Sequence, residues 1–370
     1  MYMLVNFDSY KLNVSNPDFL NICLVLLIII LSTISLTKRN RSFSFLDFSH
    51  TNQLRGIGML LIIMGHIWYH ISNSMPLFTF SGPAVSLFFI LSGFGLTRSF
   101  YKNEKINFVG FILPRIKRIF IPYWITTFII IIADIYLKGI TYEINDVFLT
   151  IFGVNLKGNI ISIDYVRWYV TLLLIWYIVF YFGFKMLNSY SWFGILIFAS
   201  IIFYLNETVF GLIWYQIFSF PIGVLLGVYY NQISVLAKRL GMWVHFLLLF
   251  VMVLGLLSGK LFLEPIVESN IVLQLIREIE GVLFSLSLVI ILYIVNNVIG
   301  EVRFLSYIGI YSYELFLLHG ALFIKYNFFT NLFSYGNWGF ILGVSLCFII
   351  TLLTAILLNR LSNKILNCTK

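Results

Sequence analysis

Arg55 and His66 lie eleven residues apart in a stretch that is otherwise almost entirely apolar. Eleven steps of an α-helix return to within about 20° of the same face and advance about 16 Å along the axis. Ionisable side chains inside an apolar membrane helix are costly and are functional candidates by default. The pair therefore predicts a groove with a guanidinium at its mouth and an imidazole at depth. The alternative is a charged anchor and a hydrogen-bonded core histidine.

A second imidazole follows one helical turn later. His66 and His70 form an H-x-x-x-H pair, the spacing of two zinc ligands on one helix face. Zinc needs at least one more protein ligand at a matching depth, and His319 is the one candidate that the sequence offers. We therefore expect no metal at these histidines.

Three glycines share this stretch with the histidine. Gly56, Gly58 and Gly65 lack a Cβ and so thin the helix. Small residues allow the backbones of membrane helices to approach closely. We expect a neighbouring helix or a ligand to lie against the backbone here.

A pair of arginines precedes another apolar run. Arg115 and Arg118 are three residues apart and so are neighbours on a helix surface. Guanidinium forks suit phosphate oxygens, which makes the pair a candidate for holding the phosphates of a cytoplasmic coenzyme. The same cluster would equally serve membrane topology or contact with anionic lipid headgroups.

Tyr313, Glu314 and His319 lie together in a later apolar stretch. On a straight helix His319 would be about 20 Å from Ser306, at roughly the depth expected for His66. Glu314 would be rotated by about 140° from His319. We therefore expect Glu314 to contact another helix, with an arginine as its expected partner.

The elements that hold these residues are membrane helices. Sixty per cent of the 370 residues are hydrophobic and 11% are charged, whereas soluble domains carry roughly 25% charged residues. The apolar residues fall in runs of about 20, enough to cross a bilayer. The sequence predicts an all-α, polytopic bundle of about eleven helices, at 19–36, 54–71, 82–97, 119–137, 168–187, 192–206, 211–230, 242–258, 272–298, 304–324 and 338–359.

The charges predict an orientation. With the N-terminus outside and the C-terminus in the cytoplasm, 17 of the 24 Lys and Arg residues fall on the inner side, as the positive-inside rule requires. The inner set is Lys38, Arg39, Arg41, Arg55, Arg98, Lys102, Lys105, Arg115, Lys117, Arg118, Lys185, Lys238, Arg239, Arg303, Arg360, Lys364 and Lys370. The net charge of +9 therefore reflects topology, and we expect no nucleic-acid partner.

The expected organisation is an N-terminal anchor helix with a basic linker over 1–45 and one membrane domain over 46–370. The first helix lacks a positive leader and a small-residue cleavage pattern, so it is expected to remain as an anchor. The longest hydrophilic stretch, about 138–167, is too short for a soluble domain. The expected location is the cytoplasmic membrane.

Four segments, in order, resemble the acyltransferase type 3 family of bacterial membrane acyltransferases. Arg55 with Gly65-His66 is similar to its R-x10-H signature, and residues 82–94 are similar to its F-F-x-L-S-G-F helix. Arg115-x-x-Arg118 with Pro122-Tyr123 is similar to its R-x-x-R segment. Residues 312–319 resemble its S-Y-x-x-Y-L-x-H helix, with Phe316 where a tyrosine is common.

The resemblance implies transfer of an acyl group, usually acetyl, from cytoplasmic acyl-CoA to an extracytoplasmic sugar, glycolipid or polysaccharide. It implies that His66 is catalytic with Arg55 as its partner and that Arg115 and Arg118 bind the coenzyme. Tyr313, Glu314 and His319 would be additional site residues. The implied partners are acyl-CoA, the acceptor, membrane lipids and polysaccharide-assembly proteins.

The segment at Trp168-Tyr169-Val170-Thr171 departs from the family pattern, because no acidic residue follows it. Polytopic proteins with buried polar residues include many transporters, so a transporter or flippase for a glycolipid or small solute is the alternative function. A non-catalytic subunit of a polysaccharide-assembly complex is a further alternative.

Overall fold

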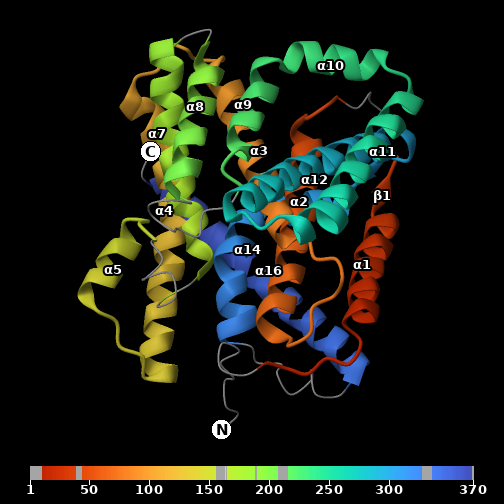
Figure 1. Ribbon diagram of the computed structural model, residues 1–370. Helices are drawn as coiled ribbons and strands as arrows, with labels where there is room; N and C mark the ends of the chain where they lie inside the picture. The colour runs from red at the N-terminus through yellow and green to blue at the C-terminus, as the bar shows by residue number, and fades with distance from the viewer. Residues whose placement is uncertain are drawn as a thin grey trace.

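The computed structural model describes residues 11–38, 44–155, 163, 165–187, 190–206, 216–326 and 336–368. The predicted all-α polytopic bundle is confirmed (Figure 1). Its described strands form one short antiparallel pair, β1 (Leu36–Thr37) with β2 (Glu301–Val302). Arg39, Arg41 and Lys370, three of the charges used to predict the orientation, lie outside the described residues.

Eight helical segments of the described chain are long and apolar enough to cross a membrane. Each corresponds to a predicted span. They are α1 (Pro17–Ile34), α2 (Phe48–His66) with η1 (Ile67–Ile71), α3 (Ser81–Phe100), α4 (Phe108–Ala133) with η2 (Asp134–Lys138), α7 (Trp168–Leu187), α11 (Met242–Ser258), α12 (Asn270–Val298) and α16 (Gly336–Cys368).

The other three predicted spans are shorter or bent. α8 (Ser191–Leu205) is a 15-residue apolar helix. α9 (Ser219–Val228) turns by 77° into α10 (Tyr230–Arg239), and part of the predicted span 211–230 lies outside the described residues. α13 (Arg303–Ile310) turns by 65° into α14 (Ser312–His319), which continues as η8 (Gly320–Lys325).

The straight helix expected over 304–324 is therefore wrong. Gly309 packs so closely on α2 that a Cβ there would lie 1.8 Å from the carbonyl oxygen of Asn52. The chain bends directly after this contact, where Tyr311 donates its N–H to Ile308. The 20 Å separation of His319 from Ser306 assumed a straight helix and does not apply. The stretch 138–167 contains one described α-helix, α5 (Ile144–Ile151).

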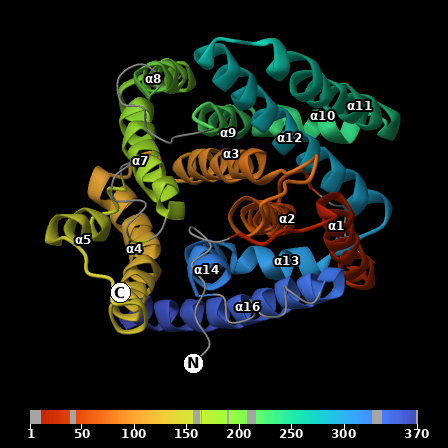
Figure 2. The same cartoon turned by 60° about the horizontal axis from the view of Figure 1, so that its bottom comes forward.

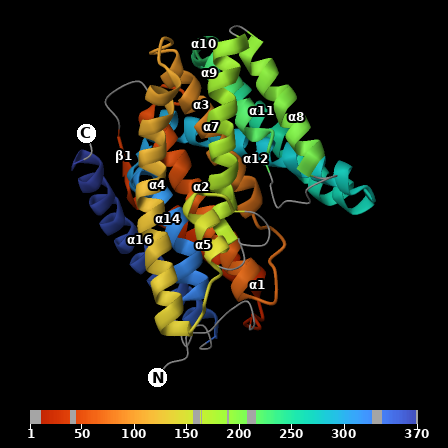
Figure 3. The same cartoon turned by 90° about the vertical axis from the view of Figure 1, so that its left-hand side faces the viewer.

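α2 lies at the centre of the half of the bundle that carries the site. Figure 2 shows it between α3 on one side and α13 on the other, and it packs against both. A second apolar core joins α3, α4, α7 and α9. α4 also contacts α14 and α16. Figure 3 shows the start of α4 and the end of α16 at the same end of the bundle.

α1 is attached to the bundle by side-chain hydrogen bonds. Trp68 donates to Asn21 at 2.8 Å, and Asp18 accepts from the N–H of Leu77 at 2.7 Å. The remaining described short segments are η3 (Tyr165–Arg167), η6 (Gly259–Leu263) and η7 (Glu264–Ile266).

Candidate active site

Two histidines from segments far apart in the sequence meet inside the bundle. The ring centroids of His66 on α2 and His319 on α14 are 5.1 Å apart, with the rings nearly perpendicular at 83°. His70 stacks on His66 at 5.7 Å. The structure thus brings together the three histidines that the sequence singled out. No group of three or more His, Cys, Asp or Glu side chains in the described ranges is arranged to hold a metal ion.

Both members of the closer pair occupy the same kind of backbone position. His66 is the last residue of α2 before the π-helical η1, and His319 is the last residue of α14 before the π-helical η8. π-helical turns are rare and often occur at functional sites. The wider turns begin where the two imidazoles meet, and no residue pattern in the sequence indicated them.

The hydrogen bonds of His319 define its chemistry. Its side chain is almost fully buried, and Nδ1 lies 2.7 Å from the carbonyl oxygen of Phe316. Because a carbonyl only accepts, Nδ1 carries the proton and Nε2 keeps its lone pair. Nε2 is buried and has no hydrogen-bond partner in the described part of the chain. The site therefore contains one imidazole with an unused acceptor atom beside a second imidazole.

Arg55 lies about three turns before His66 on α2, near Arg118 of α4. Its guanidinium donates to Asn52 at 3.2 Å and lies within electrostatic range of Arg118, Tyr169 and Tyr177. Because α2 is continuous from Phe48 to His66, Arg55 and His66 are separated by about 16 Å of helix. Arg55 is thus grouped with the arginines of α4 and lies about three turns away from the imidazoles.

The three arginines converge on one tyrosine. Tyr177 of α7 lies within electrostatic range of Arg55, Arg115 and Arg118. Like charges close together repel one another, and a bound polyanion would relieve that repulsion. The phenol hydroxyl and the guanidinium groups are all hydrogen-bond donors, as phosphate oxygens require.

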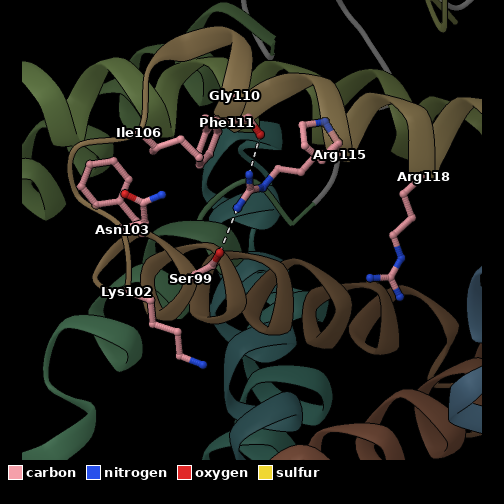
Figure 4. A pocket seen from close by; sticks show the side chains of 10 residues that line it. Ser99, Lys102, Asn103, Ile106, Gly110, Phe111, Arg115 and Arg118 are labelled. Carbon is pink, nitrogen blue, oxygen red and sulfur yellow. Dashed lines mark hydrogen bonds between the residues drawn. The ribbon is translucent and has the colours of Figure 1, made fainter. Parts of the chain in front are cut away.

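A cavity of about 560 Å³ lined by Arg115 and Arg118 opens between the end of α3 and the start of α4 (Figure 4). Its lining combines basic, amide, hydroxyl and apolar side chains. The lining residues are Ser99, Phe100, Lys102, Asn103, Ile106, Gly110, Phe111, Pro114, Arg115 and Arg118.

Arg115 and Arg118 differ in their contacts with the rest of the protein. Arg115 donates to the carbonyl of Phe111 at 2.5 Å and to Ser99 at 3.1 Å, and it lies 3.9 Å over the ring of Phe111. Arg118 is exposed and extends separately from Arg115 (Figure 4). Arg118 is therefore the arginine more available to a ligand, while Arg115 is also part of the cavity wall.

Glu314 contacts another helix, as expected. Its carboxylate accepts from the amide of Asn359 on α16 at 2.8 Å, and Arg118 lies within its electrostatic range. The hydrogen-bond partner is therefore an amide, where an arginine was expected. Tyr313 donates its hydroxyl to the carbonyl of Ile119 on α4 at 3.0 Å. These two contacts fix the start of α14 against α4 and α16.

An aromatic wall extends towards the imidazoles. Tyr169 on α7 is hydrogen-bonded to Ser92 and packs 4.6 Å from Phe89 and 5.2 Å from Phe316. Phe316 lies in turn 5.9 Å from His319. Tyr169 and Tyr177 were not selected as site residues from the sequence. Their spacing of eight residues, about two turns of one helix, could have indicated that they share a face.

A buried arginine was also missed. Arg167 at the start of α7 is fully buried, donates to Thr126 and Thr127 of α4, and lies 4.5 Å over the ring of Tyr123. In the sequence it stands at the edge of an apolar run and resembles a loop charge. Only the packing of α4 against η3 reveals it as an interior group.

One comparison with known proteins is informative. A family model described as an acyltransferase domain matches residues 48–360, nearly the whole chain. The match begins at the first residue of α2 and ends within α16, so it includes the histidines and the arginines described above. No curated protein and no solved structure was found to match.

Proposed function

The chain belongs to the acyltransferase type 3 family, and on that premise we propose that it moves an acetyl group from cytoplasmic acetyl-CoA to a hydroxyl of a cell-surface polysaccharide or lipid-linked sugar. It is a multi-pass membrane acyltransferase. The proposal adds the donor, the acceptor class and the cytoplasmic membrane as its location.

The observation that carries the proposal is the distance between the arginines and the imidazoles. Arg55 and His66 are separated by about 16 Å along α2. The pantetheine arm of coenzyme A has about thirteen bonds between its diphosphate and its sulfur, and spans about 15 Å at the rise per bond of an extended chain. A coenzyme whose phosphates are held by the arginines would therefore present its thioester near the imidazoles.

The basic end suits the donor's charge. Coenzyme A carries a diphosphate and a further phosphate, and Arg55, Arg115 and Arg118 supply three guanidinium groups near one cavity. In this proposal Arg118 and Arg55 bind phosphate oxygens directly, and Arg115 shapes the wall and contributes charge. Tyr177 adds a neutral donor among them.

The imidazole end suits the chemistry. A sugar hydroxyl is a weak nucleophile, and a positioned imidazole that accepts its proton contributes about 10²–10⁴-fold to the rate. In this role His66 accepts the proton while the hydroxyl oxygen attacks the acetyl carbonyl and the coenzyme's sulfur leaves as thiolate. In a second route His66 first takes the acetyl group as the coenzyme's thiolate leaves, and then passes it to the hydroxyl, whose proton the freed imidazole accepts. In both routes His319 lies beside the reacting imidazole.

The experiment is a turnover assay on purified protein in lipid vesicles. With acetyl-CoA outside and isolated cell-envelope glycan as acceptor, we expect free thiol to appear in step with acetylated glycan detected by mass spectrometry. A transporter or flippase would move its solute or lipid without consuming acetyl-CoA. Solute or glycolipid movement without thiol release would refute the proposal.

A further inference from the structure

A buried ion pair closes the end of the α14–η8 segment. Asp134, the first residue of η2, is fully buried, and its Oδ2 lies 2.5 Å from the ammonium of Lys325, the last residue of η8. The ammonium also donates to the hydroxyl of Tyr142 at 3.2 Å and to the carbonyl of Ile163 at 3.1 Å. Tyr142 and Tyr326 both donate their hydroxyls to Asp134.

Both charged groups of this cluster have hydrogen-bond partners. An ammonium has three N–H groups, and Lys325 directs its Nζ at three acceptors. Each carboxylate oxygen of Asp134 has at least one donor. A buried charge that loses its partner is strongly destabilising, so both members hold the cluster together. The cluster joins α4 and η2 to the end of η8.

His319 depends on its helix for its orientation. The ring's acceptors are backbone carbonyls of its own helix, those of Phe316 and Leu315, and its Nε2 has no partner in the described chain. No hydrogen bond from another described segment therefore fixes the ring. Its position against His66 follows from where α14 and η8 are held.

The two ends of this segment are held on either side of the histidine. Tyr313 and Glu314 fix its start against α4 and α16. Lys325, six residues after His319 at the end of the π-helical η8, fixes its end. The anchors on the two sides are thus five to six residues from His319 in the chain. Movement at either anchor would change the contact between His319 and His66.

We propose that Asp134 and Lys325 are positioning residues, which hold η8 so that His319 meets His66 in the arrangement that acyl transfer requires. The inference rests on the proposed function. It assigns a role to two residues that lie at the far end of α4 from the arginines. A misplacement of about 1 Å at a reacting group can cost about 100-fold in rate. The coenzyme-binding arginines should be unaffected.

The test uses Lys325→Met and the double variant Asp134→Asn/Lys325→Met in the vesicle assay. For Lys325→Met we expect kcat to fall by about 10- to 100-fold, while KM for acetyl-CoA stays within about twofold of wild type. The double variant removes both buried charges, so its melting temperature should return towards that of wild type. Its kcat should stay low, since η8 is still released.

A control is the more exposed ion pair between Arg277 and Glu264, whose side chains are 3.3 Å apart. Arg277→Met should leave kcat unchanged, because that pair joins α12 to η7 and does not contact α14. A kcat in Lys325→Met within twofold of wild type would overturn the positioning role. So would a kcat that recovers with the melting temperature in the double variant, which also decides the matter if Lys325→Met does not fold. A wild-type protein that releases no thiol refutes the proposed function itself.

Discussion

Gly56→Ala should separate the two helices that carry the site. A Cβ at Gly56 would lie 2.0 Å from the carbonyl oxygen of Leu305 and 2.8 Å from its carbon. Carbon and oxygen atoms in close contact are about 3.3 Å apart. Since both atoms belong to helix backbones, α2 and α13 must move apart locally by about 1.3 Å.

The displacement of α2 from α13 would affect both Arg55 and His319. Arg55 precedes Gly56, and its partner Asn52 lies against Gly309 of α13 one turn away. α13 leads directly into α14 and His319. Overpacking of this kind costs about 1–3 kcal/mol of stability, and a shift of about 1 Å at a reacting group costs about 100-fold in rate. We expect kcat/KM to fall by about 100-fold.

The assay is thiol release from acetyl-CoA, together with thermal unfolding of the purified protein. Gly82→Ala and Gly95→Ala are matched controls, because a Cβ at either position meets no atom within 4 Å. Both controls should retain wild-type activity and stability. If Gly56→Ala kept wild-type kcat/KM and melting temperature, the close backbone contact would not matter and the reasoning would be refuted.

Three other substitutions test separate parts of the site. Arg118→Gln should raise KM for acetyl-CoA by about 10-fold or more with little change in kcat, because it removes a charge-assisted hydrogen bond. An unchanged KM in steady-state kinetics would mean that Arg118 serves only the orientation of the chain in the membrane. Tyr177→Phe should raise the same KM by about 2- to 10-fold without loss of stability, and an unchanged KM would remove it from the coenzyme site. Asn359→Leu should lower the unfolding free energy by about 1–3 kcal/mol, because the Glu314 carboxylate loses its hydrogen-bond donor; unaltered chemical unfolding would contradict that.

The helices could be predicted because their signal is local. Run length and apolarity alone decide whether a segment can cross a bilayer. Each predicted span overlaps a described helix, although part of 211–230 lies outside the described residues. The bend before α14 could not be predicted, because it directly follows a contact of Gly309 with a helix more than 200 residues earlier. The glycines of α2 did indicate a close neighbour, and Gly56 meets the backbone of Leu305.

The site was predictable where a single helix carries the pattern. The eleven-residue spacing of Arg55 and His66 on one face survives in α2 because that helix is unbroken. The ion pair between distant segments could not be predicted from the sequence. Asp134 and Lys325 are 191 residues apart, and nothing local connects them. The π-helical turns after His66 and His319 depend on packing and have no recognisable residue pattern.

Catalysis by His66 is tested by measuring thiol release from acetyl-CoA with the His66→Ala variant in lipid vesicles. His245→Ala, which removes a buried imidazole from α11, is the control. We expect His66→Ala to be inserted and folded like wild type and to release no thiol above background, while His245→Ala retains turnover. Full turnover by His66→Ala would show that His66 is not catalytic.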